Sequence, residues 1–323
     1  MTLSQLKKNL ISIVGLLLCI SIVITEPTTS ANNNQTSDLN LSLINSFPIF
    51  INSNEDFIAL NFTGEGTINN PYLIENLNIV STSELTSAIR ISGTDVYFII
   101  QNCVITSKYI GIAILETVEA GTAKIINNTI TCSSKNGGGI SISSSNTILE
   151  NNTISGFMQG IHVNEADYTT IKGNIIHLSY YQGINIRYSG FNTITDNDIR
   201  DSNQHGLALV GSSSMYNIIY GNIFVNNSNE PTYEIDGGVV IGDTSSQGYD
   251  GASNNQWYDS VHQKGNSWDD YDGEGTYSID GSAGSEDLYP ERYITQTAGN
   301  NSITIVTLIT IIGLTALTIR RRK

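Results

Sequence analysis

The chain has 323 residues, of which 14% are charged, and 15 Lys and Arg stand against 30 Asp and Glu for a formal net charge of −15. This acidic balance argues against nucleic acid as a partner, because phosphates are bound through a basic surface. Asn, Ser, Thr, Gly and Ile dominate, so the chain is poor in helix formers and rich in β-branched residues. We therefore expect an all-β protein, with a cation or a neutral glycan as the easier partner.

The first 30 residues have the features of a signal peptide. Lys7 and Lys8 precede an uncharged apolar run over residues 10–24, which has the length of a signal-peptide core and is short for a membrane span. Residues 31–61 are predicted to form a disordered lead and an N-terminal cap. The mature protein is therefore expected to leave the cytoplasm.

Two linked patterns recur along the middle of the chain. In the first, an apolar residue, two variable residues, Asn, one variable residue and another apolar residue follow one another, at Asn102, Asn128, Asn152, Asn174, Asn197 and Asn222. In the second, a small residue precedes an apolar, variable, apolar triplet, at residues 88–91, 111–114, 139–142, 160–163, 183–186, 206–209 and 238–241. The Asn positions are 22 to 26 residues apart, which indicates a structural repeat.

A repeat of this length, with short alternating strands and no helical period, fits one coil of a parallel β-helix. Alternating Ile and Val residues then face inward and stack on their equivalents about 4.8 Å away. An inward Asn at the bend between strands bonds amides of neighbouring coils, and Gly serves the next corner. The sequence predicts an all-β, single-stranded parallel β-helix of about seven or eight coils over residues 62–290.

The C-terminal part is predicted to close the stack of coils and to anchor it. Trp257 and Trp268 are the only tryptophans, and together with nearby acidic residues they are expected to form a cap on the last coil. Residues 291–302 are predicted to form a stalk. Residues 303–319 are apolar apart from Thr and Gly and precede the basic tail 320–323, which indicates a transmembrane helix with a cytoplasmic tail. A sorting tail that is removed is the alternative.

Two cysteines remain in the mature chain. Cys103 and Cys132 permit one disulfide without requiring it, and the repeat places them at different points of their coils. Both are expected to be free, buried thiols.

Several segments resemble those of known proteins. They are GEGTINNPYLIENLNI, the repeated NNTI with GI.I, and the finish NNQWYDSVHQKGNSWDDY followed by GSAGSEDLYP. Over residues 62–290 the chain resembles the NosD-type periplasmic copper-binding β-helix proteins and the wider right-handed β-helix surface proteins of archaea. The resemblance implies a right-handed parallel β-helix and a role in metal handling or as an accessory protein. The pectin-lyase-like relatives of this group imply polysaccharide lyases, hydrolases and epimerases.

This resemblance suggests a metal site, and the residues of the chain favour calcium over copper. Copper prefers clustered His, Met or Cys ligands, whereas the four His are widely spread and Met158 and Met215 are the only methionines of the mature chain. Copper binding is not expected, and no cofactor is required. Calcium is better motivated, because carboxylates crowd among Gly turns and a hard cation takes several oxygen ligands from such loops. The predicted ligands are Asp270, Asp272, Glu274 and Asp280, with a solvated acidic loop as the alternative.

A candidate catalytic group follows from the repeat. His177 and Arg200 each lie three residues after their repeated Asn, so they should be neighbours on adjacent coils. Asp201 follows Arg200, and His205 precedes the corner Gly206. A lyase or epimerase needs a base, a cation at the substrate carboxylate and usually an acid on one exposed strip. An outward polar ladder that keeps the surface soluble is the alternative, and the lack of a paired-carboxylate motif favours a protein without catalysis.

Aromatic and polar residues also gather where a sugar could bind. The tyrosines of two coils lie beside Asn and Arg, and flat aromatic faces next to such groups suit sugar rings. His162 and Asn185 share one outward column. The predicted glycan-binding residues are Tyr180, Tyr181, Tyr188, Arg187 and His162, with Tyr168 near them. The same tyrosines could instead anchor loops.

The sequence therefore predicts a membrane-anchored, extracytoplasmic β-helix at the cell surface that binds or displays a glycan, with a polysaccharide as its partner. NosD-type metal handling is the first alternative, and a polysaccharide lyase, epimerase or hydrolase is the second.

Overall fold

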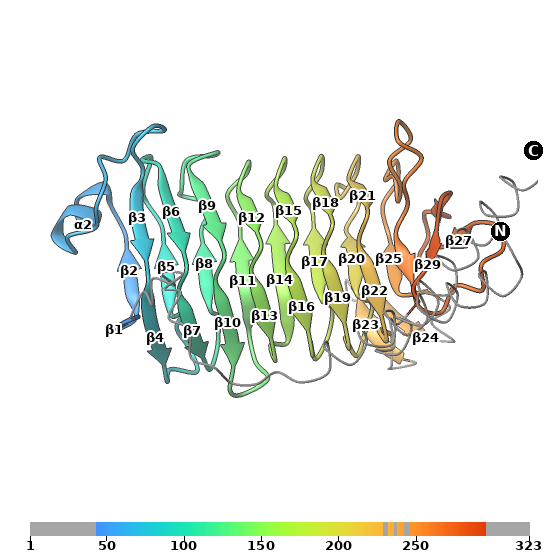
Figure 1. Cartoon of the computed structure of the whole chain (residues 1–323), viewed down its shortest axis with the longest axis horizontal. Coiled ribbons are helices and arrows are strands. Elements are labelled where there is room, and N and C mark those ends of the chain that lie inside the picture. Colours follow the sequence, from blue (N-terminus) through green and yellow to red (C-terminus); the bar gives the residue numbers. More distant parts are fainter. Residues whose placement is uncertain (1–42, 229–231, 236–237, 242–245, 295–323) are drawn as a thin grey trace, which may run out of the picture. The chain divides into compact units, whose positions relative to one another are not determined.

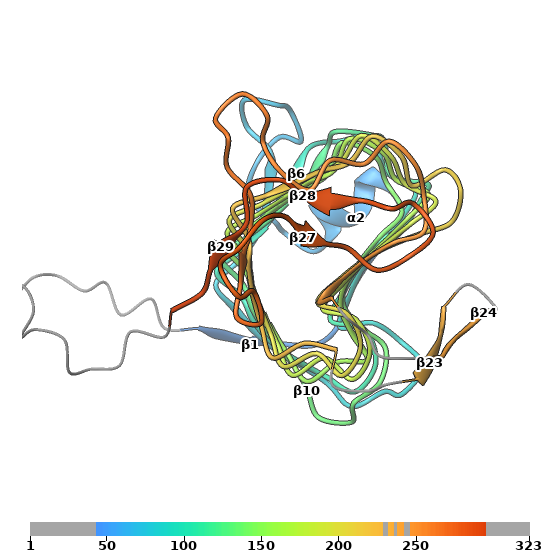
Figure 2. The same cartoon turned by 90° about the vertical axis from the view of Figure 1, so that its right-hand side faces the viewer.

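The computed structural model describes residues 43–228, 232–235, 238–241 and 246–294. Three parallel β-sheets, named A, B and C here, run through these residues, and the chain visits them in turn so that each circuit adds one coil (Figure 1). The described chain makes about eight right-handed coils. Figure 2 looks along the stack and shows successive coils lying over one another. The predicted parallel β-helix is confirmed.

Each sheet consists of short strands from successive coils. Sheet A contains β1 (Ile44–Ser46), β4 (Leu77–Ser81), β7 (Val104–Ser107), β10 (Thr129–Cys132), β13 (Thr153–Ser155), β16 (Ile175–His177), β19 (Asp198–Arg200), β22 (Ile223–Val225), β26 (Ser267–Trp268) and β29 (Glu291–Arg292). Sheet B contains β2 (Ile49–Ile51), β5 (Ile89–Ile91), β8 (Ile112–Ile114), β11 (Gly138–Ile142), β14 (Gln159–Asn164), β17 (Ile184–Arg187), β20 (Leu207–Val210) and β25 (Gly248–Asp250). Sheet C contains β3 (Tyr72–Glu75), β6 (Phe98–Gln101), β9 (Ala123–Ile126), β12 (Ile148–Glu150), β15 (Thr170–Lys172), β18 (Thr193–Thr195) and β21 (Ile218–Tyr220).

The core is a set of inward columns of apolar side chains. Because side chains alternate along a strand, each short strand gives one or two residues to the interior. In sheet A the inward column is Ile79, Ile105, Ile130, Ile154, Ile176, Ile199, Phe224 and Trp268, all fully buried. Burial of one such side chain stabilises the fold by about 1.5–3 kcal/mol, so the columns hold the coils together.

The repeated Asn side chains form a continuous ladder between sheets C and A. The N–H and Nδ2 of Asn128 both donate to Oδ1 of Asn152 at 3.0 Å, and Nδ2 also reaches the carbonyls of Ile100 and Ile126. The ladder, which we call the Asn ladder, consists of Asn128, Asn152, Asn174, Asn197, Asn222 and Asn266. All six side chains are buried, and an unpaired buried polar group would cost about 1–3 kcal/mol.

The Asn ladder differs from the sequence pattern at its start. Asn102 lies one position earlier, with φ 54°, in a column of left-handed residues where Asn127 and Asn151 have φ 57° and 55°. The ladder position of this coil belongs to Cys103, whose N–H donates to Oδ1 of Asn128 at 3.0 Å. Asn tolerates the left-handed conformation better than most residues. Adjacent positions therefore belong to two different columns, the left-handed column and the Asn ladder. The sequence pattern assigned Asn102 to the ladder, whereas it lies in the left-handed column.

The N-terminal end of the stack is covered by a short helix, α2 (Asn54–Ala59), at the left of Figure 1. Phe57 of this helix is fully buried and stacks on Tyr72 with ring centroids 4.8 Å apart. Strands β1 and β2 precede the helix and already pair with β4 and β5. Within the described residues, the stack of coils therefore already includes Ile44, ahead of the predicted boundary at residue 62.

The C-terminal end is closed by aromatic rings and a buried carboxylate. Trp268 stacks on Phe224 and on Tyr277, with ring centroids 4.3 and 4.1 Å apart. Its Nε1 donates to Asp287 at 3.1 Å, and Asp287 also accepts from the N–H and Nδ2 of Asn266 at 2.7 and 3.2 Å. Burial raises the pKa of Asp287 above its ordinary value. The strands β27 (Tyr277–Ser278) and β28 (Glu286–Asp287) form an antiparallel pair in this cap.

One predicted copy of the repeat lies outside the stack. Residues 238–241 form β24 (Gly238–Ile241), which pairs antiparallel with β23 (Thr232–Ile235) in a hairpin that projects from the coils in Figure 2. The place next to β20 in sheet B is taken by β25 instead. The prediction for this copy is wrong, because an apolar strand pairs as readily with a close neighbour in sequence as with the stack.

In the part of the chain that the structure describes, no helix is long and apolar enough to cross a membrane. The predicted signal peptide 1–30 and transmembrane helix 303–319 lie outside the described residues, as do the tail 320–323 and most of the predicted stalk. At the start of that stalk, β29 still pairs with β26, so sheet A continues to Arg292.

Candidate functional site

The predicted catalytic residues lie close in sequence but face different partners. His177 on β16 pairs with Arg200 on β19, as the repeat predicted. The guanidinium of Arg200 donates through Nε and Nη2 to the carboxylate of Asp198, and through Nη2 to the hydroxyl of Tyr293 at 3.1 Å. The bond to Asp198 is the main cause that raises the pKa of Arg200. Arg200 is thus held by two neighbours beside His177.

The other two predicted catalytic residues do not join this pair. Asp201 accepts a hydrogen bond from Nδ2 of Asn226 at 2.6 Å. His205 is fully buried, and its Nε2 lies 3.0 Å from Oδ2 of Asp280. Burial lowers the pKa of His205, although Asp280 acts in the opposite direction. His205 therefore does not reach the exposed strip that the sequence predicts, because it lies in the corner before β20 rather than on the surface.

The four predicted calcium ligands are not gathered. Asp270 accepts from the hydroxyl of Tyr277 at 3.0 Å, Asp272 accepts from the N–H of Glu274 at 2.9 Å, and Asp280 faces His205. Among the described residues, no three or more His, Cys, Asp or Glu side chains are placed to hold a metal ion together. The geometry of this segment gives the calcium hypothesis no support.

The predicted glycan-binding residues occupy two neighbouring coils. Tyr180 and Tyr181 lie in the turn before β17, with exposed fractions of 44% and 36% and ring centroids 5.6 Å apart. Lys135 from another coil places its Nζ 6.0 Å from the Tyr180 ring centroid. At the other end of β17, the guanidinium of Arg187 lies over the ring of Tyr188, 5.0 Å from its centroid. Aromatic rings therefore flank both ends of β17.

Between these ends, His162 and Asn185 form a polar pair on the outward face of sheet B. They are directly paired on β14 and β17, and Ile184 and Ile186 on either side of Asn185 point into the core. Nε2 of His162 and Oδ1 of Asn185 are both buried, and neither has a hydrogen-bond partner within the described part of the chain. Burial, and then the charge of Arg187, lower the pKa of His162. The imidazole is therefore neutral near pH 7 and able to donate or accept at this position.

A row of amides borders this pair. Nε2 of Gln159 donates to Oε1 of Gln182 at 3.1 Å, and Nε2 of Gln182 donates in turn to Oε1 of Gln204. Nδ2 of Asn185 lies 3.5 Å from Oε1 of Gln182. The outward face of β14 and β17 therefore combines neutral donors and acceptors with one cation, which is a surface suited to hydroxyl groups.

A second aromatic feature escaped the sequence analysis except for Tyr168. Tyr168, Phe191 and Tyr216 stack on successive coils with ring centroids 5.1 and 5.0 Å apart, and we call them the aromatic row. Their exposed fractions are 55%, 47% and 48%, and their φ angles are 57°, 58° and 61°. A residue held in such a conformation costs about 1–3 kcal/mol, whereas each stacked pair returns about 0.5–1.5 kcal/mol. The spacings of 23 and 25 residues match the repeat and could have revealed the row.

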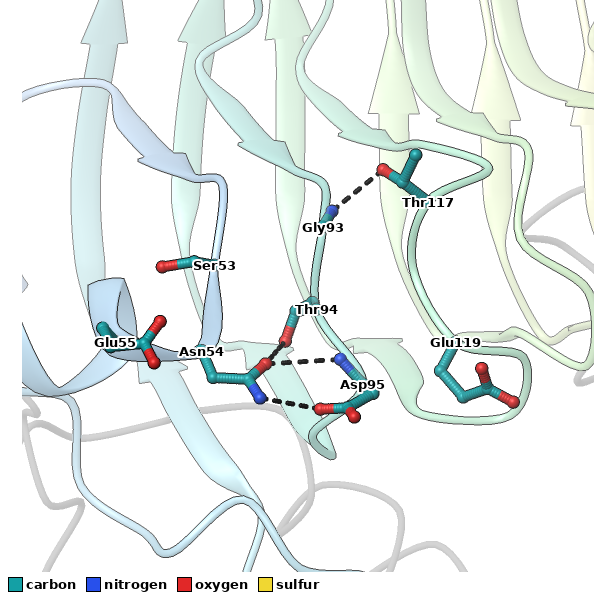
Figure 3. A pocket seen from close by; sticks show the side chains of 8 residues that line it. All are labelled: Ser53, Asn54, Glu55, Gly93, Thr94, Asp95, Thr117 and Glu119. Atoms are coloured by element: carbon teal, nitrogen blue, oxygen red, sulfur yellow. Dashed lines mark hydrogen bonds between the residues drawn. The ribbon is translucent and has the colours of Figure 1, made fainter.

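Acidic clefts lie in the turns that follow sheet B in the first coils. One cleft of about 310 Å³ is lined by Ser53, Asn54, Glu55, Gly93, Thr94, Asp95, Thr117 and Glu119 (Figure 3). In it, Asn54 donates to Asp95 at 2.7 Å and accepts from the hydroxyl of Thr94 at 2.6 Å, so these side chains tie α2 to the next coil. An adjoining cleft of about 350 Å³ shares Thr117 and Glu119. The contacts of Asn54 drawn in Figure 3 serve the N-terminal cap, and the N–H of Gly93 donates to the hydroxyl of Thr117 on the next coil at 2.9 Å.

A comparison of the sequence with protein families matches residues 116–282 to the right-handed β-helix region. The chain belongs to the right-handed β-helix family. This membership agrees with the resemblance found in the sequence and with the three parallel sheets. Among curated proteins, no sequence matches the chain.

The solved structures that are similar to the chain include an alginate lyase, a DFA-IIIase and XylC. An alginate lyase from a Paenibacillus species is 15% identical with a TM-score of 0.40, over 76% of this chain and 95% of the lyase. A DFA-IIIase from Arthrobacter chlorophenolicus is 15% identical with a TM-score of 0.38, over 72% of this chain and 55% of that one. XylC, solved with xylose, is 15% identical with a TM-score of 0.38, over 57% of this chain and 36% of that one. The chain spans about half the length of the DFA-IIIase and about a third that of XylC.

Proposed function

We propose that this β-helix binds a polysaccharide on the outward face of sheet B, at β14 and β17. The observation that carries the proposal is the pair of buried atoms without partners, Nε2 of His162 and Oδ1 of Asn185, on adjacent coils. Leaving such groups unpaired costs about 1–3 kcal/mol each. Because both atoms are buried, a ligand reaches them only when the side chains over them turn aside. A sugar hydroxyl both donates and accepts, so it can then satisfy an amide oxygen and a neutral imidazole at once.

The neighbours of this pair support a sugar rather than a simple ion. Tyr180 and Tyr181 before β17, and Tyr188 after it, offer partly exposed rings, and aromatic faces pack against the apolar faces of sugars. Arg187 adds a donor fork beside His162. Aromatic contacts with convergent polar groups are typical of small-molecule sites.

We also propose that the protein is located at the cell surface. The apolar segments 10–24 and 303–319, with Lys7 and Lys8 before the first and residues 320–323 after the second, favour a β-helix held outside the cytoplasm by a C-terminal membrane helix. A surface position would bring the outward face of sheet B into contact with extracellular polysaccharide.

The test is glycan binding by the full-length chain in detergent, screened on an array of neutral and acidic polysaccharides and then measured by calorimetry. The variant Asn185→Leu keeps the volume of the side chain and removes Oδ1, and it should weaken binding about tenfold, which corresponds to about 1.4 kcal/mol. Thr106→Val, on the outward face of sheet A, is the matched control and should bind like the wild type. Equal affinity of wild type and Asn185→Leu would contradict the proposed site, and no binding to any glycan would contradict the function.

A polysaccharide-modifying enzyme is the second candidate, and it is favoured by the pairing of His177 with Arg200. Turnover would appear as new reducing ends or as absorbance from unsaturated uronate products, and His177→Ala should abolish it while glycan binding remains. Absence of product from every glycan that binds would leave binding as the function.

A further inference from the structure

The aromatic row lies in the turns that lead into sheet C. Tyr168, Phe191 and Tyr216 each stand two residues before an outward-facing residue of β15, β18 or β21, three strands that are neighbours in Figure 1. The N–H of Tyr168 donates to the carbonyl of Gly190, and the N–H of Phe191 donates to that of Met215, so the three residues share one column. The row therefore runs along the stack of coils.

The backbone of this column does not require aromatic residues. The same column holds Asn146 on the coil before the row and Asn254 on the coil after it, with φ 56° and 61°. Asn adopts the left-handed conformation at a lower cost than a bulky aromatic residue. Three successive coils nevertheless carry rings that remain about half exposed. The free-energy cost of holding three aromatic residues in the left-handed conformation exceeds the stabilisation from two stacked pairs. We therefore look for a second role of the rings.

The stack leaves parts of the ring faces open. The ring planes are within 13° and 16° of parallel, and the centroids are 5.1 and 5.0 Å apart. Carbon atoms in contact lie about 3.5–4.0 Å apart, so rings that touch at these centroid distances must be displaced sideways. The result is a stepped surface in which each coil presents an edge and part of a face.

The surroundings of the row are mostly neutral and polar. Thr170, Thr193 and the partly exposed Ile218 lie beside it on sheet C, and Asn146 and Asn254 lie at its ends. The nearby carboxylate of Asp167 already accepts from the N–H of Gly190 at 2.7 Å. A protein partner would need a wider apolar patch than three rings with polar neighbours. Sugar units, with one apolar face and hydroxyl groups around the rim, match both parts of this surface.

We propose that the aromatic row is a second contact surface for the same polysaccharide, and that the ligand is a neutral, extended pyranose chain lying along the stack of coils. The inference rests on the proposed function. Tyr188, at the end of β17, is three residues before Phe191, so the row borders the proposed site. One ring per coil repeats at a distance close to the advance of one sugar unit in an extended chain. The net charge of −15 disfavours a polyuronate.

The test compares chain length and charge of the ligand. Full-length wild type and the triple variant Tyr168→Asn, Phe191→Asn, Tyr216→Asn are titrated with neutral hexaoses and bioses of glucose, mannose and xylose and with two uronate hexaoses. Asn is native at this position on the flanking coils, so the variant should fold, and its urea midpoint confirms this. The wild type should bind a neutral hexaose at least tenfold more tightly than the matching biose, and the triple variant should lose that difference.

Two further variants separate the outcomes. Phe47→Asn removes a ring that is 89% exposed elsewhere and should leave binding unchanged, whereas Asn185→Leu should weaken the biose and the hexaose alike. If the triple variant keeps the hexaose preference, or if only uronates bind, the inference about the row is overturned while the proposed function stands. If the wild type binds none of the sugars, both are overturned.

Discussion

Cys103 takes the place of an asparagine in the Asn ladder. Its Sγ lies 3.6 Å from the carbonyl of Ile74 and 3.3 Å from that of Gln101, the same pair of positions that Nδ2 of Asn128 serves one coil later. Burial raises the pKa of Cys103 to about 11, so it remains a thiol, which is a weak donor. Both described cysteines are free, as predicted, although Cys132 is only half-buried. The hydrogen bonds at Cys103, on the coil before the first Asn of the ladder, are therefore weaker than those of the ladder itself.

Restoring the missing amide should stabilise the fold. In Cys103→Asn, the new Nδ2 can donate to both carbonyls and to Oδ1 of Asn128, so the free energy of unfolding should rise by about 0.5–1.5 kcal/mol. Urea denaturation measures the change, and Cys132→Ser, outside the Asn ladder, is the control. A loss of stability in Cys103→Asn would show that this coil has no room for an amide.

His162 gives stability a dependence on pH. Its pKa is lowered in the folded protein by burial and by Arg187, whereas in the unfolded chain it is about 6.5. The unfolded chain therefore binds more protons in this range, so stability is retained above about pH 6.5 and lost as the pH falls toward the folded pKa. Acid acts here by protonating, in the unfolded chain, an imidazole that the folded protein keeps buried and neutral.

Replacing this imidazole should reduce the effect. The difference in the free energy of unfolding between pH 7.5 and pH 5.5 is expected to be smaller in His162→Gln than in the wild type, because Gln does not titrate. Asp287 titrates in both proteins and cancels in the comparison. An identical pH dependence in the two proteins would mean that His162 is no more buried in the folded than in the unfolded chain.

Among the elements, the repeated strands were predictable and the inserted or terminal ones were not. The register that placed His177 beside Arg200 and His162 beside Asn185 is confirmed by the strand pairing, since each depends on a fixed distance from a repeated residue. The hairpin of β23 and β24 and the buried position of His205 depend on contacts that the repeat does not encode. The aromatic row was missed because it follows the repeat in its turns, where residue type is otherwise variable.

The acidic segment after β26 satisfies its carboxylates internally. Asp270 accepts from Tyr277 and also from Nε2 of Gln247 at 2.8 Å, and Asp272 is bound by the N–H of Glu274. These hydrogen bonds stabilise the carboxylates of Asp270 and Asp272, as a bound cation would also do.

Removal of divalent cations should therefore leave stability unchanged. The melting temperature in EDTA is expected to equal that in millimolar calcium, because Asp270, Asp272, Glu274 and Asp280 do not converge on one point. Differential scanning calorimetry on the full-length chain measures both states. A calcium-dependent rise in melting temperature that disappears in Asp272→Asn would instead establish the calcium site predicted from the sequence.

On the scale of the whole molecule, each coil contacts only its neighbours, so stability is distributed along the stack. The last coil depends on the cap, where Trp268 stacks on Phe224 and Tyr277 and its Nε1 donates to Asp287. A solenoid without a cap exposes its core and its strand edges. Loss of the cap should therefore be felt most strongly in the coils next to it.

The variant Trp268→Ala should cost about 3–5 kcal/mol at the C-terminal end, because it removes a large buried ring. Amide hydrogen exchange should become faster in β22, β25 and β26 and remain slow in β6, β9 and β12. Leu288→Ala, at a half-exposed position of the same cap, is the control. Equally fast exchange in all coils would mean that the stack unfolds as one cooperative unit.

The Asn ladder has a direction, and this direction fixes where it ends. Each Asn of the ladder donates two hydrogen bonds to the Asn of the next coil and accepts two from the Asn of the coil before. If the last position were also Asn, its donors would need an acceptor on a further coil. Asp287 receives the donors of Asn266, and a carboxylate has no hydrogen to pass on. The Asn ladder thus ends because the side chain of Asp287 accepts hydrogen bonds and cannot donate one. A second copy of the chain arriving at this end would meet no donor that continues the Asn ladder, so the carboxylate also discourages growth into fibres.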